Sequence, residues 1–383
     1  MTNRDRALAV LRYQPYDHLP LVHFGFWNET LDKWAEEGHI TEEEARRWGD
    51  GNAFDRSIAG KLGFDFNWSA GTGLHVGLRP GFPREIIRDL GGGARHVRNG
   101  NGVVELERDG ATSIPQEISH LLVDRASWEE HYLPRLQFHP DRVPREAIAR
   151  LLERYGRTGW ADEPAPVGLY IGSLYGCIRD WVGVVGLSYL QADDEDLYAE
   201  IIDTVGHLCC RTLEETLALC QPCGRPAGLF DYAHMWEDIC FRSGPLVIPR
   251  VFADLVGPHY KRLTDLLRRQ GTDLVSLDCD GCIDALVPIW LENGVNTMFP
   301  IEVGVWDGGI APWREAYGKA LRGVGGMDKN VFSRDFAAVD AEVERLRPLV
   351  ALGGYLPCPD HRIAPDAKWE NVCYYTRRMR EEF

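Results

Sequence analysis

Residues 274–281 read Leu-Val-Ser-Leu-Asp-Cys-Asp-Gly, a short apolar run that leads directly into two carboxyl groups and a glycine. Because side chains alternate between the two faces of a strand, Asp278 and Asp280 are expected to share one face with Ser276. Two neighbouring carboxyl groups at the end of a buried strand need compensation by a metal, another cation, hydrogen bonds or a shared proton. This stretch therefore predicts a buried strand that ends in a functional site. The alternative is that both aspartates only cap the following loop and helix.

The chain around this stretch repeats a strand followed by a helix. The predicted strands are 19–24, 167–172, 227–232, 274–280, 297–302, 323–327 and 352–355. This order predicts an α/β fold with a parallel sheet. A strand count close to eight favours a closed (β/α)8 TIM barrel over an open sheet, with residues 1–383 forming a single domain.

Residues 60–122 interrupt this pattern. They contain many glycines, short extended segments and two hairpin-type turns, Gly-Asn-Gly at 100–102 and Asp-Gly at 109–110. We therefore expect a β-rich, antiparallel insertion after the first strand region of the barrel.

The composition excludes several classes of partner. The 383 residues are 44% hydrophobic, which is ordinary for a globular chain, and the formal net charge is −16. This charge argues against nucleic acid and against a polybasic membrane contact. No run of about 20 apolar residues and no apolar signal segment is present, so a cytoplasmic protein with ten free cysteines is expected.

Catalytic side chains of a barrel collect where its strands end. This rule gives four candidate catalytic residues, Asp278, Asp280, Lys329 and His361. It also gives candidate substrate-binding residues, which are His23, Trp27, Tyr170, Arg179, Asp231, His234, Trp236, Glu302 and Arg362. Each has a simpler structural explanation when taken alone: a packed core histidine, a helix cap, a local ion pair or a core aromatic. Their convergence on one face favours an active site for a small molecule.

Asp278, Asp280 and His361 form the strongest group of candidate ligands. Carboxylate oxygen and imidazole suit zinc or another divalent metal and leave positions open for water or substrate. Without a metal, the two carboxyl groups could act as a general acid and a general base, since proximity raises the pKa of one of them. Both interpretations remain open at this point.

A set of short motifs, in this order along most of the chain, resembles the uroporphyrinogen decarboxylase superfamily, which includes corrinoid-linked, zinc-dependent methyltransferases. The motifs are Arg6-Ala-Leu-Ala-Val-Leu, Asp17-His-Leu-Pro-Leu, Trp236-Glu-Asp-Ile, Ser243-Gly-Pro-Leu-Val-Ile-Pro, Leu277-Asp-Cys-Asp-Gly, Leu291-Glu-Asn-Gly-Val-Asn, Gly326-Met-Asp-Lys, Gly353-Gly-Tyr-Leu-Pro and Asp360-His-Arg-Ile-Ala-Pro-Asp. The resemblance implies a (β/α)8 barrel with its site at the carboxyl-terminal mouth. It also allows for a homodimer.

The chain departs from both branches of this superfamily. The decarboxylases carry arginines in the loop after the first strand, where this chain has Phe24-Gly-Phe-Trp-Asn-Glu-Thr. The methyltransferases hold zinc with a His-x-Cys pair and a late cysteine. These positions correspond to Asp278, Asp280 and a residue at or near His361. Any metal ligands here are therefore chemically harder than the thiolates of the methyltransferases.

Three functions follow from the residues and the resemblance. The first is a metal-assisted methyltransferase or demethylase that acts on a small O- or N-methylated compound, with a separate corrinoid protein as acceptor. The second is a cofactor-free decarboxylase or lyase of a small or porphyrin-like carboxylic acid. The third is a non-catalytic barrel that binds a small molecule.

Overall fold

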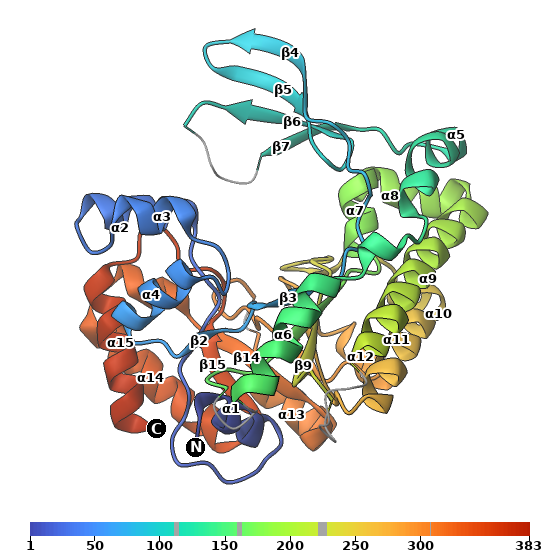
Figure 1. Cartoon of the computed structure of the whole chain (residues 1–383). Coiled ribbons are helices and arrows are strands. Elements are labelled where there is room, and N and C mark those ends of the chain that lie inside the picture. The colour runs from blue at the N-terminus through green and yellow to red at the C-terminus, as the bar shows by residue number, and fades with distance from the viewer. Residues whose placement is uncertain (111–114, 159–162, 221–227, 307) are drawn as a thin grey trace.

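Seven parallel strands form the central sheet of the protein, which we describe from a computed structural model (Figure 1). The structure describes residues 1–110, 115–158, 163–220, 228–306 and 308–383. The sheet order is β15-β14-β13-β12-β9-β8-β3. Its strands are β3 (Gly71–Gly73), β8 (Gly168–Gly172), β9 (Tyr232–Trp236), β12 (Leu274–Asp278), β13 (Thr297–Phe299), β14 (Arg322–Met327) and β15 (Tyr355–Pro359). The predicted parallel α/β arrangement is thus confirmed.

A second, two-stranded parallel sheet lies between β15 and β3, the two edge strands of the seven-stranded sheet. It pairs β1 (Val22–His23) with β2 (Phe66–Asn67), and only residues 68–70 separate β2 from β3. At the other end, Phe26 forms an isolated parallel bridge with Ile363, just beyond β15. Because β1 and β2 are two residues long, the described parallel strands form two ladders instead of the single closed ladder of eight that the sequence predicts.

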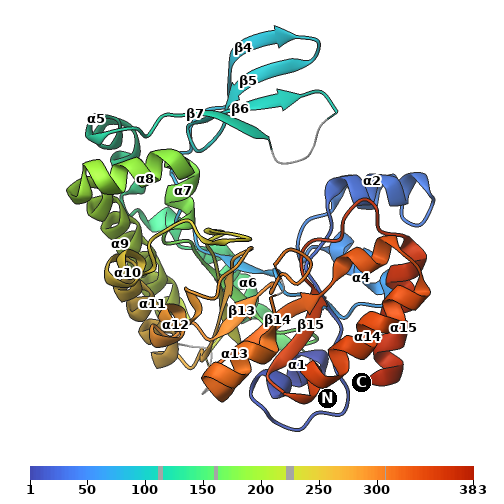
Figure 2. The ribbon, with the colours of Figure 1, turned by 180° about the vertical axis from the view of Figure 1, so that it is seen from behind.

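Helices follow the strands and cover the outside of the sheet. Before β8 they are α1 (Asn3–Leu11), α2 (Asn28–Glu36), α3 (Glu42–Arg47), α4 (Ala53–Leu62), α5 (Arg125–Ser127) and α6 (Arg145–Thr158). After β8 they are α7 (Gly176–Val182), α8 (Val184–Asp193), α9 (Glu195–Leu219), α10 (Pro249–Leu255), α11 (Gly257–Arg269), α12 (Val287–Glu292), α13 (Ile310–Tyr317), α14 (Phe336–Ala351) and α15 (Trp369–Glu382). Figures 1 and 2 show α9 to α12 on one side of the sheet and α14 and α15 on the other. None of the described helices is long and apolar enough to cross a membrane.

The core lies between the sheet and these helices, and local sequence explains where the elements begin and end. Leu277 and Met298 are at most 1% exposed, as buried parallel strands require. The Asp335 side chain accepts a hydrogen bond from the backbone N–H of Ala338 at the start of α14, which fixes where that helix begins. Asn52 caps α4 in the same way.

A four-stranded antiparallel sheet stands away from this body (Figures 1 and 2). It contains β4 (Glu85–Gly91), β5 (Ala94–Arg98), β6 (Val103–Arg108) and β7 (Gln116–His120) in that order. The antiparallel insertion is therefore present, but it begins later than the predicted residue 60. Residues 53–62 are helical, and residues 66–73 supply β2 and β3 to the parallel sheets.

Two predicted strands are wrong in position. The strand predicted at 227–232 is β9, which begins at Tyr232, so Asp231 precedes the strand instead of following its buried part. The strand predicted at 352–355 is β15. Helix α14 continues to Ala351, and Gly353 and Gly354 turn the chain with φ of 66° and 62° before Tyr355. Apolar runs in the preceding turns resemble strand residues, which explains both shifts.

Candidate functional site

The carboxyl ends of the parallel strands bring the candidate residues to one edge of the sheet. Asp278 ends β12, and it lies in register with Trp236 at the end of β9 and with Phe299 at the end of β13. Two residues earlier, Ser276 lies in register with His234, which in turn is opposite Tyr170 of β8. Residues between 21 and 64 positions apart in the chain thus become direct neighbours across the sheet.

A continuous series of aromatic rings crosses this edge. Trp27 stacks on His361 with 5.3 Å between ring centroids, and His361 meets Phe24 at 5.6 Å. Phe24 contacts Phe299 at 4.5 Å, Phe299 contacts His234 at 5.4 Å, and His234 lies 6.3 Å from Tyr170. We call these six residues the ring series.

Asp278 is a buried carboxyl group beside the ring series. The residue is 8% exposed, and its carboxyl group accepts no hydrogen bond from the part of the chain that the structure describes. Its Oδ2 lies 4.0 Å from Nε2 of His234. Burial raises the pKa of Asp278 well above its ordinary value, and the neighbouring Asp280 carboxylate raises it further.

His234 is a neutral neighbour of Asp278. Burial lowers the pKa of His234 to about 4, so its imidazole is uncharged at neutral pH. Its Nδ1 lies 3.2 Å from the hydroxyl oxygen of Ser276, which also accepts a hydrogen bond of 3.1 Å from Nε1 of Trp68. These contacts hold the ring without supplying a positive charge to Asp278.

Asp280 and His361 form the second contact of the site. Oδ2 of Asp280 lies 3.3 Å from Nε2 of His361. The other oxygen, Oδ1, is buried and has no hydrogen-bond partner within the described ranges. Since β12 and β15 are separated by β13 and β14 in the sheet, the loops after these strands close over the intervening edge.

Glu302 adds a third carboxyl group. Its Oε2 accepts a hydrogen bond of 2.7 Å from the backbone N–H of Gly281, directly after Asp280. Burial raises the pKa of Glu302, and the nearby Asp280 carboxylate raises it further. Glu302, a predicted substrate-binding residue, thus lies beside Asp280.

The candidate cations of the site are already paired. Arg179 contacts Asp238 at 3.1 Å and Asp180 at 3.2 Å, and its guanidinium lies over the ring of Trp236 at 5.7 Å. Lys329 Nζ lies 3.6 Å from Asp360. Arg362 pairs with Asp50 at 2.7 Å and lies over the ring of Phe24 at 5.4 Å.

The three predicted metal ligands do not form a metal-binding group as placed. Asp280 and His361 approach each other, but no three His, Cys, Asp or Glu side chains are arranged to hold a metal ion among the described residues. The described cysteines form no disulfide with one another. The side chains are of a kind that zinc accepts, but their placement in the described part of the chain brings together no set of three ligands.

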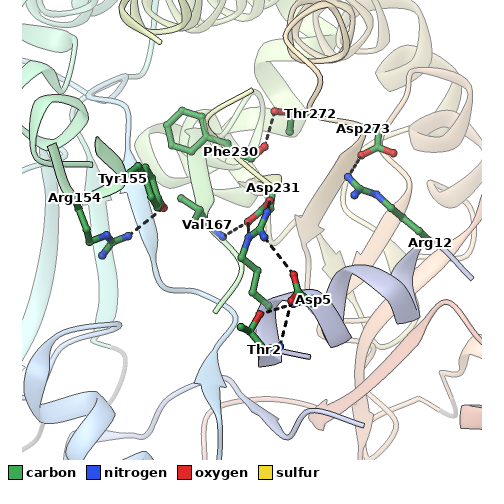
Figure 3. Close-up of polar contacts among 11 residues, drawn as sticks. Thr2, Asp5, Arg12, Arg154, Tyr155, Val167, Phe230, Asp231, Thr272 and Asp273 are labelled. Carbon is green, nitrogen blue, oxygen red and sulfur yellow. Dashed lines mark hydrogen bonds and ion pairs between the residues drawn. The ribbon is translucent and has the colours of Figure 1, made fainter. Parts of the chain in front are cut away.

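Asp231 is a correction to the predicted site. It lies at the amino end of β9, where the Arg4 side chain donates two hydrogen bonds to it, 2.7 Å from Nε and 2.6 Å from Nη2. The backbone N–H of Val167 donates a third of 2.9 Å (Figure 3). Asp231 is 3% exposed and joins α1 to the sheet at the edge opposite the site.

His23 occupies the core beside the site. It is fully buried, its Nδ1 accepts a hydrogen bond from the N–H of Gly25, and its ring lies 5.4 Å from Phe26 and 5.3 Å from Phe64. The protonated nitrogen must then be Nε2, which has no partner among the described residues. The sequence had left a packed core histidine as the alternative for this residue.

Glu237 is a buried residue that sequence reasoning missed. Its carboxylate accepts hydrogen bonds from the backbone N–H groups of residues 174, 175 and 176, and from the hydroxyls of Ser173 and Tyr260. It holds the turn between β8 and α7, the helix that carries Arg179. A charged residue directly after the end of a buried strand was the available signal.

Comparison with known proteins supports the fold. No family model matches the chain, and no curated protein matches it. Among solved structures, the chain is similar to a methyltransferase from Methanosarcina mazei, with a TM-score of 0.59, 15% identity, and coverage of 100% of this chain and 99% of that chain. A second structure is described as a "Putative Vitamin-B12 Independent Methionine Synthase" from Listeria monocytogenes, with a TM-score of 0.39, 12% identity and coverage of 96% and 99%. At these identities the first likeness shows a shared fold alone.

Proposed function

We propose that this chain is an enzyme that removes a methyl group from a small methylated compound and passes it to a corrinoid held by a separate protein. The observation that carries the proposal is the group of Asp278, Asp280 and Glu302 beside the ring series, at the carboxyl edge of a parallel sheet. Convergent ionisable and aromatic groups at this edge are typical of active sites in such folds. The fold shared with a methyltransferase is consistent with this activity.

The proposed architecture is a (β/α)8 barrel formed by one chain. The Phe26–Ile363 bridge links β1 to β15, and the step from β2 to β3 carries the pairing to β8. These contacts support eight parallel segments around one mouth. The antiparallel sheet of β4 to β7 is then an insertion between the second and third segments.

The proposed reaction breaks one bond and forms one. The bond between the methyl carbon and its oxygen or nitrogen breaks, the heteroatom keeps the electron pair, and the methyl group passes to the reduced corrinoid of the partner. An oxygen leaving group also takes up a proton, which a carboxyl group such as Asp278 or Asp280 could donate. Trp27, Tyr170 and Trp236 are proposed to enclose the substrate. No step is assigned to a metal, because the candidate ligands do not form a binding group.

The paired cations make the decarboxylase alternative weaker. A substrate with several carboxylates needs free cationic partners, whereas Arg179, Lys329 and Arg362 each already contact a carboxylate of the chain. The non-catalytic alternative predicts no turnover with any methyl donor.

The test is methyl transfer to free cob(I)alamin by the purified full-length protein. A panel of methoxy and N-methyl compounds is supplied, and methylcobalamin is followed by its absorbance, with metal analysis of the same preparation. We expect transfer from at least one donor, reduced at least tenfold by Asp280→Asn and unchanged by Glu146→Gln, a change on the exposed surface of α6. Folded protein that transfers no methyl group from any donor would contradict the proposal.

A further inference from the structure

We infer that the ligand of this site is a small N-methylated ammonium ion, held by the ring series and by Asp278, Asp280 and Glu302. The inference rests on the proposed function for its reaction, since it names the class of methyl donor. It rests on the structure alone for binding, which can be measured without any turnover.

The first argument is the balance of charge at the site. Each of the three permanent cations at this edge, Arg179, Lys329 and Arg362, contacts a carboxylate outside the group of Asp278, Asp280 and Glu302. Asp278 and Glu302 form no ion pair with Lys or Arg in the described part of the chain, and the contact of Asp280 is a histidine. A cationic ligand compensates these carboxyl groups in their charged form, which a neutral or anionic ligand cannot do.

The second argument is the state of the buried oxygens. Asp278 is 8% exposed and its carboxyl group accepts no hydrogen bond from the described residues. Oδ1 of Asp280 is also buried without a partner there. Because buried polar atoms are normally satisfied, the unpaired Oδ1 of Asp280 beside the carboxyl group of Asp278 points to a group that the described residues do not supply.

The third argument selects an organic cation. The ring series places Trp27, Phe24 and Phe299 beside the same carboxyl groups, and a methylated ammonium is attracted to aromatic faces as well as to carboxylates. Two rings at this edge already bind cations of the chain: Arg179 lies over Trp236 at 5.7 Å and Arg362 over Phe24 at 5.4 Å. A bare divalent metal would instead need three or more converging ligands, and the described residues do not form such a group.

This class of donor also fits the proposed transfer. When the carbon–nitrogen bond of a quaternary ammonium breaks, nitrogen keeps the electron pair and becomes a neutral tertiary amine. The methyl group passes to the reduced corrinoid of the partner, and no proton is needed to balance the step. The site then requires charge compensation for binding but no obligatory proton donor.

Binding of matched probes to the full-length protein tests the inference. The probes are choline, tetramethylammonium and 3,3-dimethylbutan-1-ol, which is the uncharged carbon analogue of choline. Isothermal titration calorimetry is run on wild type, Asp280→Asn, Asp278→Asn and the surface control Glu146→Gln. We expect at least one of the two cations to bind, and to do so at least tenfold more tightly than the alcohol. Each site variant should weaken the cation at least fivefold and leave the alcohol unchanged.

The outcomes separate this inference from the proposed function. Three outcomes would overturn the inference. They are the absence of binding by both cations, equal affinity for choline and the alcohol, and cation binding that neither site variant weakens. Should circular dichroism show that Asp278→Asn is unfolded, Asp280→Asn decides, because Asp280 is partly exposed. Cation binding without methyl transfer would leave the inference standing and contradict the proposed function. Methyl transfer from neutral methoxy donors without cation binding would support the proposed function and contradict the inference.

Discussion

Nε2 of His361, in the loop after β15, lies 3.3 Å from Oδ2 of Asp280, in the loop after β12. The two residues are separated by 80 positions in the chain and by two strands in the sheet. Their contact joins the loops after β12 and β15. It lies beside Asp278, Glu302 and the stacked ring of Trp27.

A double-mutant cycle should reveal energetic coupling between Asp280 and His361. The variants are Asp280→Asn, His361→Gln and the combination, each measured for kcat/KM of methyl transfer. Because the two side chains are in contact, their effects should fall short of additivity by about 1 kcal/mol, roughly a fivefold difference in kcat/KM. Fully additive losses would mean that the contact has no part in catalysis.

Asp231→Asn should destabilise the protein without affecting substrate binding. Arg4 is left as a buried cation with a weakened partner, which typically costs about 3–5 kcal/mol when a buried pair is broken. Urea unfolding measures this loss. Asp17→Asn, which removes the pairing of Arg6 with a half-exposed carboxylate, should cost far less.

The same Asp231→Asn preparation tests the corrected position of Asp231. Protein that remains folded should keep the wild-type KM, since the residue lies at the edge opposite the site. A raised KM in a correctly folded variant would show that Asp231 belongs to the substrate site, contrary to its position in the structure.

Gly176→Ala should prevent stable folding. A β-carbon at this position would lie 1.9 Å from the carbonyl oxygen of Glu237, a backbone atom that cannot move away cheaply. Gly60→Ala is the matched control, because Gly60 is exposed in the helix α4 and a β-carbon there meets nothing within 4 Å. It should stabilise the protein by about 0.5–1 kcal/mol, measured by thermal unfolding. A soluble Gly176→Ala protein with wild-type stability would show that the turn after β8 is not as described.

The buried His234 should make stability depend on pH. The unfolded chain binds a proton at this residue below pH 6.5, whereas the folded protein does so only below a pKa of about 4. Between these values the unfolded state binds more protons, so folding free energy is lost as the pH falls from about 6.5 to 4. At pH 5 the loss relative to pH 7 should be about 2 kcal/mol.

His234→Gln removes this proton and provides the comparison. Urea unfolding at pH 7 and pH 5 should show a difference in slope between wild type and variant, because only wild type carries the contribution of His234. Identical pH dependence in both proteins would show that the imidazole titrates normally in the fold.

Much of the architecture could be predicted from the order and spacing of apolar residues. The strand predicted at 274–280 is present as a buried strand at 274–278, because its five consecutive residues suit a strand covered on both faces. The hairpin turns at 100–102 and 109–110 correctly marked the antiparallel sheet. The short strands β2 and β3 were not predicted, because two or three residues carry no periodic signal.

The candidate site was predictable only in part. Asp278, Asp280, Glu302 and His361 could be found because they follow predicted strands. Asp231 was misplaced because the apolar pair Leu229 and Phe230 lies before β9 and resembles the strand itself. The role of Glu237 was not predictable, because all of its hydrogen-bond partners lie more than 20 residues away in the chain.

By itself, the sequence determined that a parallel α/β fold would form and that carboxyl groups would stand at the end of its strand at 274–278. Both follow from local alternation, apolar runs and turn residues, which act over a few positions. Only the tertiary structure decided which charges meet. It paired Arg179, Lys329 and Arg362 with other carboxylates and left Asp278 and Glu302 without a permanent cation among the described residues. Such pairing depends on the register and separation of strands that are distant in sequence, and no local pattern encodes it.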